Sequence, residues 1–242
     1  MIMKYVSIPN LPQGEAAAVI VSGEISSESE YVLNSSGIQT IKTSAHQLLY
    51  DAVKFHPDMV IHHIGNENFI GENETISALN VCLGDKIQGI YPYDVLYNAA
   101  RVGNYLICNR QYTEEKIIEH CHSKNIEIIN VKQGYAKCNV CVVSDNAIIT
   151  SDVGIARAAN KHGIDVLFVD DCNVKLKGFA HGFLGGATGK ISADKLAVNG
   201  NITHHKNCSE ITKFANKYNV EIVSLNNGDI EDIGSILPIL EK

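Results

Sequence analysis

Two segments of the chain carry side chains that could do chemistry, and the first is a C-x-x-C pair. Cys138 and Cys141 form this pair, and Lys137 beside Cys138 could lower the pKa of that thiol and make it a nucleophile in a cleft. A zinc site would need a second pair of ligands, and residues three apart on a strand point to opposite faces. We therefore expect two separate buried cysteines, with Cys138 as a reserve nucleophile, and neither a metal nor a cofactor.

The second segment is rich in glycine and follows a histidine. His181 precedes residues 182–189, so its side chain could project beside exposed backbone amides and act as an acid or base. Residues 185–190 invite comparison with a phosphate-binding loop, but the spacing before Lys190 is one residue short and Ile191 stands where Ser or Thr is needed. Tight packing or close backbone approach is the better interpretation of these glycines, and an anion-binding nest is the weaker alternative.

The elements that must position these side chains are indicated by a repeated local pattern. Gly37, Asn125, Gly163 and Asn219 each end a helix-like stretch and stand directly before a short β-branched run. Gly and Asn tolerate the left-handed conformation that closes a helix, and Ile and Val alternating with polar residues favour a strand. The sequence therefore predicts a series of helix, stop and strand.

The spacing of this pattern indicates five units. Strands that precede the helices are expected to start at 19, 60, 106, 148 and 196, and a further apolar stretch follows each unit. The second unit is the weakest, with residues 46–56 helix-like and residues 75–83 a helix that Gly84 could stop. Because each strand-helix-strand-strand unit must bury its flank on a neighbour, we expect one α/β domain over residues 1–242, folded as a five-fold pseudo-symmetric ring, or α/β propeller. The alternative is a doubly wound Rossmann-like sheet, but no G-x-G-x-x-G follows the first strand.

An acidic cluster lies just before the last predicted strand. In a ring, the ends of such strands face a central cavity, so Asp229 and Asp232 could hold a guanidinium or an amine there. The alternative is a solvated acidic turn.

Three stretches resemble an uncharacterised bacterial group of the pentein, or guanidine-modifying-enzyme, fold. They are residues 133–138, 182–189 and 232–238. In catalytic penteins a cysteine near the C-terminus attacks the guanidino or amidino carbon, a histidine of an earlier strand passes protons, and carboxylates hold the cation. Here the matching segment, 229–237, has no cysteine, and Ser235 or Gly234 stands in its place. Tyr135 stands nearest the place of the histidine, on an expected strand over residues 134–143.

The resemblance implies a protein that binds, and can hydrolyse, a small cationic guanidino or amidino metabolite in a central pocket without the usual thiol. The alternative is a non-catalytic interaction protein on the same fold, as in the ribosome anti-association factor of archaea and eukaryotes. The site residues expected are Asp229, Asp232, Tyr135 and Lys137 for the ligand, with Ser235 in the nucleophile's place, His181 as acid or base and Cys138 in reserve.

Composition limits the partners and the compartment. The chain has 27 acidic and 20 basic residues, for a net charge of −7, which argues against nucleic acid or an anionic membrane as a partner. The N-terminus lacks the features of a signal peptide, and no apolar run approaches the roughly 20 residues of a membrane span. Seven cysteines without disulfide spacing favour reduced thiols. We therefore expect a cytoplasmic protein with a small-molecule ligand.

Overall fold

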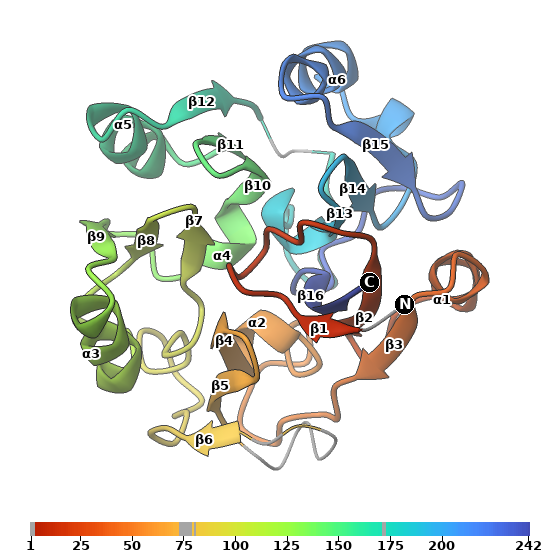
Figure 1. Ribbon diagram of the computed structural model, residues 1–242. Helices are drawn as coiled ribbons and strands as arrows, with labels where there is room; N and C mark the ends of the chain where they lie inside the picture. Colours follow the sequence, from red (N-terminus) through yellow and green to blue (C-terminus); the bar gives the residue numbers. More distant parts are fainter. Residues whose placement is uncertain (1–2, 73–78, 80, 171–172) are drawn as a thin grey trace.

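The computed structural model describes residues 3–72, 79, 81–170 and 173–242, and within them the chain forms five small sheets (Figure 1). In pairing order, the first sheet holds β1 (Lys4–Tyr5), β16 (Leu237–Glu241), β2 (Ala16–Val21) and β3 (Gln39–Lys42). The others are β4 (Ile61–Gly65), β5 (Asn68–Gly71) and β6 (Val81–Leu83); β7 (Ala100–Val102), β8 (Tyr105–Cys108) and β9 (Glu127–Asn130); β10 (Cys141–Ser144), β11 (Ala147–Thr150) and β12 (Asp165–Phe168); β13 (Thr188–Ser192), β14 (Lys195–Val198) and β15 (Glu221–Ser224).

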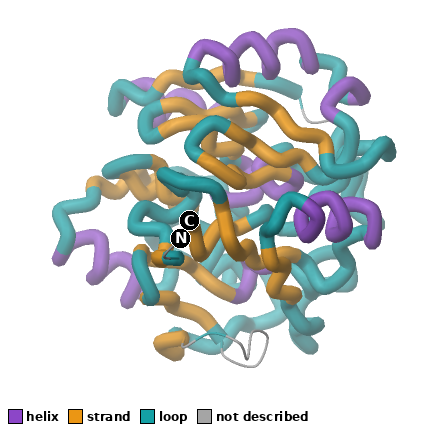
Figure 2. The backbone as a smooth tube through the Cα atoms, turned by 45° about the vertical axis from the view of Figure 1, so that its right-hand side comes forward, coloured by secondary structure: helices purple, strands orange, loops and turns teal. Residues whose placement is uncertain are grey.

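All five sheets share one pattern of strand pairing. In each sheet one strand pairs antiparallel with one neighbour and parallel with the other, as β11 does with β10 and β12 and as β2 does with β16 and β3. A parallel pair needs a crossover, and in four sheets a helix supplies it. These helices are α1 (Ser27–Ser35), α3 (Glu115–Ser123), α5 (Val153–Lys161) and α6 (Cys208–Lys217). They lie toward the outside of the molecule in both views (Figures 1 and 2). In chain order the unit is strand, helix, strand, strand, as the sequence predicts.

The predicted helix stops are confirmed by the backbone. Gly37, Asn125, Gly163 and Asn219 have φ values of 76°, 54°, 78° and 56°. This left-handed conformation reverses the chain after each outer helix and directs it into the parallel strand.

The last strand completes the first sheet. β16 pairs antiparallel with β2, with Leu237 opposite Ile20, so the two ends of the described chain lie side by side (Figure 1). The five sheets follow one another around the middle of the molecule, and no strand pairing joins one described sheet to the next. The structure thus shows a mixed α/β fold of small sheets rather than the single sheet of a Rossmann-like fold.

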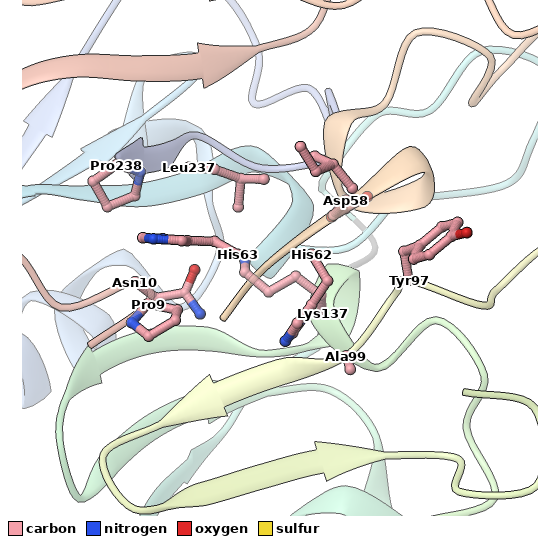
Figure 3. Close-up of a pocket in the computed structure, with 11 residues that line it drawn as sticks. Pro9, Asn10, Asp58, His62, His63, Tyr97, Ala99, Lys137, Leu237 and Pro238 are labelled. Carbon is pink, nitrogen blue, oxygen red and sulfur yellow. The ribbon is translucent and has the colours of Figure 1, made fainter. Parts of the chain in front are cut away.

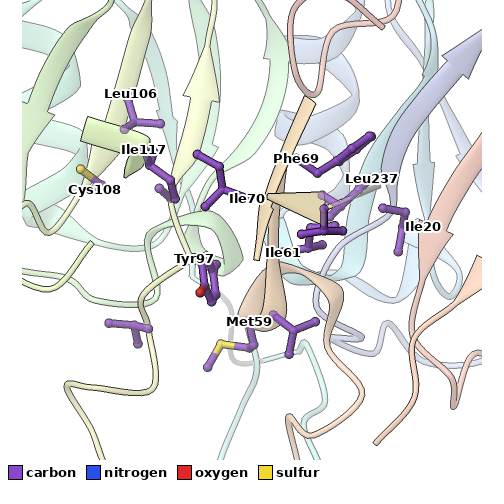
Figure 4. Packing of buried hydrophobic residues seen from close by; sticks show 14 of the residues in the cluster. Ile20, Met59, Ile61, Phe69, Ile70, Tyr97, Leu106, Cys108, Ile117 and Leu237 are labelled. Carbon is purple, nitrogen blue, oxygen red and sulfur yellow. The ribbon is translucent and has the colours of Figure 1, made fainter. Parts of the chain in front are cut away.

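The largest apolar cluster joins several sheets. Figure 4 shows side chains of β2, β4, β5 and β8 packing with α3 and β16. Phe69, Ile61 and Leu106 are each no more than 2 % exposed. Because burying each such side chain contributes about 1.5–3 kcal/mol, this cluster holds neighbouring units together.

Short helical turns lie near the middle of the molecule, and some were not expected. They are α2 (Pro57–Val60), α4 (Ala136–Asn139) and the 3-10 turn η1 (Gly185–Ala187), while a second 3-10 turn, η2 (Ile202–His204), precedes α6. Residues 46–56 form turns rather than the predicted helix, and residues 134–143 contain α4 followed by β10 rather than one strand. Cys138 and Cys141 therefore belong to different elements, and both are buried.

The second unit is offset from the prediction. Of the predicted helix over residues 75–83, residues 75–78 and 80 lie outside the described residues, and Val81–Leu83 is strand β6. The counterpart of β2 is β5, which begins at Asn68, whereas the strand predicted at 60 is β4. In the part of the chain that the structure describes, no helix is long and apolar enough to cross a membrane.

Candidate functional site

Five turns converge at the middle of the molecule, and each precedes the innermost strand of a sheet. These strands are β4, β7, β10, β13 and β16 (Figure 1). One residue stands two or three positions before each strand: Asp58, Asn98, Cys138, Gly186 and Ser235. The fold therefore brings one position of every unit to a common point.

Hydrogen bonds connect these positions to one another. The Ser235 hydroxyl donates to Asp58 Oδ2 at 2.6 Å, and the Cys138 thiol lies 3.3 Å from the same oxygen. The Asn98 side chain accepts from the backbone N–H of Cys138 and donates to its sulfur at 3.1 Å. The Ser235 N–H donates to the Gly186 carbonyl at 2.6 Å.

The ionisable and hydroxyl side chains buried around this point form a group that we call the central polar cluster. It consists of His56, Asp58, Lys137, Cys138, Asp232 and Ser235. No member is more than 4 % exposed. Burial of so many ionisable groups is costly unless they are paired, so the cluster is a candidate site on physical grounds.

The position of Ser235 depends on an unusual backbone. Gly234 and Ser235 have φ values of 72° and 77°, and a positive φ is uncommon outside glycine. A Cβ at Gly234 would overlap His56, so only glycine fits there. Such backbone strain persists where the surroundings hold it, here the 2.6 Å hydrogen bond to Gly186.

Lys137 points away from solvent and into the cluster. Its Nζ donates to Ser235 Oγ at 2.9 Å and lies 3.5 Å from the Gly185 carbonyl. The Ser235 hydroxyl therefore links the ammonium group of Lys137 to the carboxylate of Asp58.

Burial dominates the electrostatics of the remaining members. It raises the pKa of Asp58, while His56, when protonated, and Lys137 oppose that shift. It also raises the pKa of the Cys138 thiol, and Asp58 and Asp232 add to this effect. Burial lowers the pKa of His56 to about 4, so its imidazole is neutral at pH 7. The resting thiol is protonated, and a cation beside it would favour the thiolate.

A cavity of about 280 Å3 opens on one side of the cluster, and we call it the aromatic cavity. Its walls are mainly aromatic and aliphatic, and its polar lining includes Cys138, His56 and Asp232. The lining residues are Tyr50, Val53, His56, Tyr135, Cys138, Leu176, Phe179, Ala180, His181, Phe183 and Asp232. No Lys or Arg is among these described residues.

A much smaller cavity of about 20 Å3 lies against other members of the cluster. Figure 3 shows Asp58 and Lys137 among its lining residues, together with His62 and His63 of β4. This volume suits about one water molecule. Of these two cavities at the central polar cluster, the aromatic cavity is the one large enough for a metabolite.

The structure brings most of the predicted site residues together. Lys137, Cys138, Asp232 and Ser235 belong to the central polar cluster, while Tyr135 and His181 line the aromatic cavity. The glycines of residues 185–189 allow close packing, since a Cβ at Gly186 would overlap the Asp232 carboxylate.

Asp229 does not lie with the others. Its side chain is 50 % exposed and pairs with Lys175 at 2.5 Å and with His204 at 3.2 Å. This is the solvated acidic turn that the sequence left open as the alternative.

The sequence reasoning missed His56, Asp58 and Asn98. All three lie in the irregular segments around the second unit, where the helix-stop-strand pattern is weakest. The signal that could have found them is positional: each lies shortly before an innermost strand, as Cys138 and Ser235 do.

Solved structures similar to this chain are enzymes that act on guanidino or amidino groups. An amidinotransferase of the saxitoxin pathway from Microseira wollei aligns over 91% of each chain, with a TM-score of 0.55 and 11% identity. An agmatine deiminase from C. jejuni aligns over 97% of each chain (TM-score 0.53, 12% identity). An inosamine-phosphate amidinotransferase from Streptomyces griseus covers 97% of this chain and 96% of its own (TM-score 0.55, 9% identity).

These likenesses confirm the predicted pentein fold; at such low identity they establish the fold alone. A search of curated protein sequences found no match. Comparison with family models matches residues 20–237, which include the whole central polar cluster. The chain therefore belongs to the family of unknown function DUF6873, and it has a pentein fold.

Proposed function

We propose that this protein binds a small guanidino or amidino cation in the aromatic cavity and hydrolyses it with the Cys138 thiol. The observation that carries the proposal is a cavity of about 280 Å3 whose mainly apolar walls meet a buried carboxylate and a thiol. Ligand sites are typically apolar cavities with a few convergent polar groups.

Asp232 is the group best placed to receive the cation. Its oxygens accept from the backbone N–H groups of Phe183 and Gly234, each at 3.0 Å, so the carboxylate is fixed in place while it lines the cavity. A planar cation that donates to a buried carboxylate forms a charge-assisted hydrogen bond, about twice as strong as a neutral one. Tyr135 and Phe183 also line the cavity, and an aromatic ring there can attract the same cation.

Cys138 is the nucleophile in this proposal because it lines the cavity and its sulfur lies beside a proton acceptor. The thiol passes its proton to Asp58, 3.3 Å away, and the thiolate attacks the amidino carbon to form a C–S bond. Asp58 returns this proton to the departing amino group, so a C–N bond breaks and ammonia leaves. Water, deprotonated by His181 at the cavity rim, attacks the same carbon, and the C–S bond breaks. The sulfur regains a proton from His181, and a guanidino ligand gives a ureido product while an amidino ligand gives an amide.

Ser235 has a supporting role in this scheme. It occupies the nucleophile's place in the chain, but it is fully buried and does not line the aromatic cavity. Its hydroxyl instead holds Asp58 and Lys137 in position. Lys137 is bonded to Ser235 and is not among the residues that line the aromatic cavity, so in this scheme it does not contact the ligand.

We further propose that the five units form a closed five-fold ring around this site. The pairing of β16 with β2 and the contacts among the five converging turns support closure. A purely structural ring would have a centre filled by apolar side chains. The polar centre of this protein favours a ligand-binding function over the scaffold alternative.

The test uses two matched carboxylate variants. Purified protein is titrated with methylguanidine, agmatine, arginine and benzamidine while thermal stability, ligand affinity and ammonia release are measured. Asp232→Asn should weaken binding about tenfold to a hundredfold, because it removes a charged hydrogen bond worth about 1.5–3 kcal/mol. The same change at the exposed Asp229 should have no effect, and Cys138→Ser should abolish ammonia release.

Two results would refute the proposal. Absence of a stability change with every compound would exclude cation binding. Equal affinity in wild type and Asp232→Asn would show that the cation binds elsewhere.

A further inference from the structure

His56 carries a ring nitrogen whose bonding capacity the protein leaves unused. Within the described residues, its Nδ1 is buried without a hydrogen-bond partner, and it lies 3.8 Å from Asp232 Oδ1. A buried polar atom without a partner costs about 1–3 kcal/mol. The proposed reaction gives this imidazole no role, so the presence of a buried ring nitrogen without a partner needs another explanation.

The atoms around His56 have the spacing of a metal site. A ring nitrogen of His56, a carboxylate oxygen of Asp58 and the sulfur of Cys138 all lie within 4.8 Å of one another. The sulfur is 3.3 and 3.4 Å from the two Asp58 oxygens. Ligand atoms around a tetrahedral zinc ion are about 3.6 Å apart, so thiol and carboxylate already have nearly this spacing and the imidazole needs a shift of at most about 1 Å.

We propose that His56, Asp58 and Cys138 bind a divalent transition metal ion of the Zn2+ class. Imidazole, carboxylate and thiolate together suit Zn2+ and Co2+, whereas Mg2+ and Ca2+ prefer oxygen ligands alone. Three protein ligands leave a fourth position. Because His56 and Cys138 both line the aromatic cavity, that position faces the cavity and can hold water or a small ligand.

Charge and protons balance at this site. Binding forms a metal–sulfur bond and releases the thiol proton to solvent. The positive charges of the divalent metal ion and Lys137 equal the negative charges of the Cys138 thiolate, Asp58 and Asp232. The formal charge of the cluster is therefore zero. Lys137 does not occupy the metal position, since its Nζ donates to Ser235.

This inference goes beyond the proposed function. A sulfur that is bound to a metal cannot attack an amidino carbon, so metal binding and the thiol reaction exclude each other at Cys138. Binding of an organic cation at Asp232 does not require the metal, so each idea can fail without the other.

The experiment is a Co2+ titration of chelator-treated protein, followed by absorbance. One Co2+ per chain should bind and give a thiolate-to-metal charge-transfer band with the visible bands of a tetrahedral ion, and one proton per metal should be released. Cys138→Ser should remove the charge-transfer band, and His56→Gln should weaken binding by more than about tenfold. Cys141→Ser, which changes the other buried cysteine of the C-x-x-C pair, should bind as wild type does.

A second measurement covers the case in which the variants do not fold. In wild-type protein, Zn2+ should slow alkylation of Cys138 by iodoacetamide, read by mass spectrometry, and should leave the exposed Cys82 unchanged. Absence of the charge-transfer band, its survival in Cys138→Ser, or equal alkylation of Cys138 with and without Zn2+ would overturn the proposal.

Discussion

The link between Lys137 and Asp58 through Ser235 makes a quantitative prediction about stability. Hydrogen bonds of 2.9 and 2.6 Å to one hydroxyl oxygen place the ammonium nitrogen and the carboxylate oxygen at most about 5.5 Å apart. At an effective dielectric constant of about 20, two unit charges at that distance attract by about 3 kcal/mol. Removing either partner leaves the other buried without compensation, which costs about 3–5 kcal/mol.

A double-mutant cycle isolates this attraction. Lys137→Met keeps most of the side-chain volume, and Asp58→Asn keeps an acceptor for the Ser235 hydroxyl. Each single variant should lose about 3–5 kcal/mol of unfolding free energy. The double variant should be more stable than the sum of the two losses predicts, by about 3 kcal/mol.

The assay is equilibrium urea unfolding of the four proteins with a chelator present, so that no bound metal contributes. It is run at about pH 8, because burial raises the pKa of Asp58 and the carboxylate must be ionised. Losses that add to within about 0.5 kcal/mol would refute the reasoning, because independent sites add to that accuracy.

Three further predictions concern residues around the site. Gly186→Ala should cost about 1–3 kcal/mol and weaken cation binding, because its Cβ would displace Asp232; urea unfolding and ligand titration check this. Asn98→Ala should cost about 2 kcal/mol, because it leaves backbone N–H groups at the start of α4 without an acceptor; urea unfolding again measures it. Burial lowers the pKa of His63 to about 4, so unfolding should become easier as pH falls from about 6.5 to 4, by up to about 3 kcal/mol. His63→Phe, which can still stack on Phe69, should reduce this acid-side loss; equal pH profiles in the two proteins would contradict the assignment.

The repeat was predictable because it is encoded locally. A left-handed residue at each helix end depends on the sequence of that segment alone, and Gly37 and Asn219 both adopt the predicted conformation. The second unit was misplaced because residues 46–56 have apolar spacing typical of a helix, yet form turns that lead to α2. Tertiary contacts decide such segments, and these contacts are not visible in a local pattern.

The members of the site were only partly predictable for the same reason. Cys138 and Ser235 stand out by residue type or by resemblance, whereas Asp58 follows Pro57 in a segment without a motif. Its importance comes from convergence, because units far apart in sequence deliver side chains to one point. Asp229 shows the opposite error, since it lies three residues from Asp232 but on the surface. Proximity in sequence says little about which carboxylate turns inward at the end of a loop.

Convergence of the turns brings residues of different units close together. The fifth turn carries Ser235 and no thiol, but the third turn places the thiol of Cys138 near the same point. Ser235 Oγ and Cys138 Sγ lie 2.6 and 3.3 Å from the same oxygen of Asp58, so they are at most about 6 Å apart. In the proposed function the nucleophile therefore stands in the third turn rather than the fifth, at most about 6 Å from Ser235. The surroundings of the two residues differ, however, because Cys138 lines the aromatic cavity and Ser235 is enclosed between Lys137 and Asp58. In the proposed function, Cys138 therefore supplies the reactive thiol of the third turn, whereas the Ser235 hydroxyl of the fifth turn joins the Lys137 ammonium group to the Asp58 carboxylate.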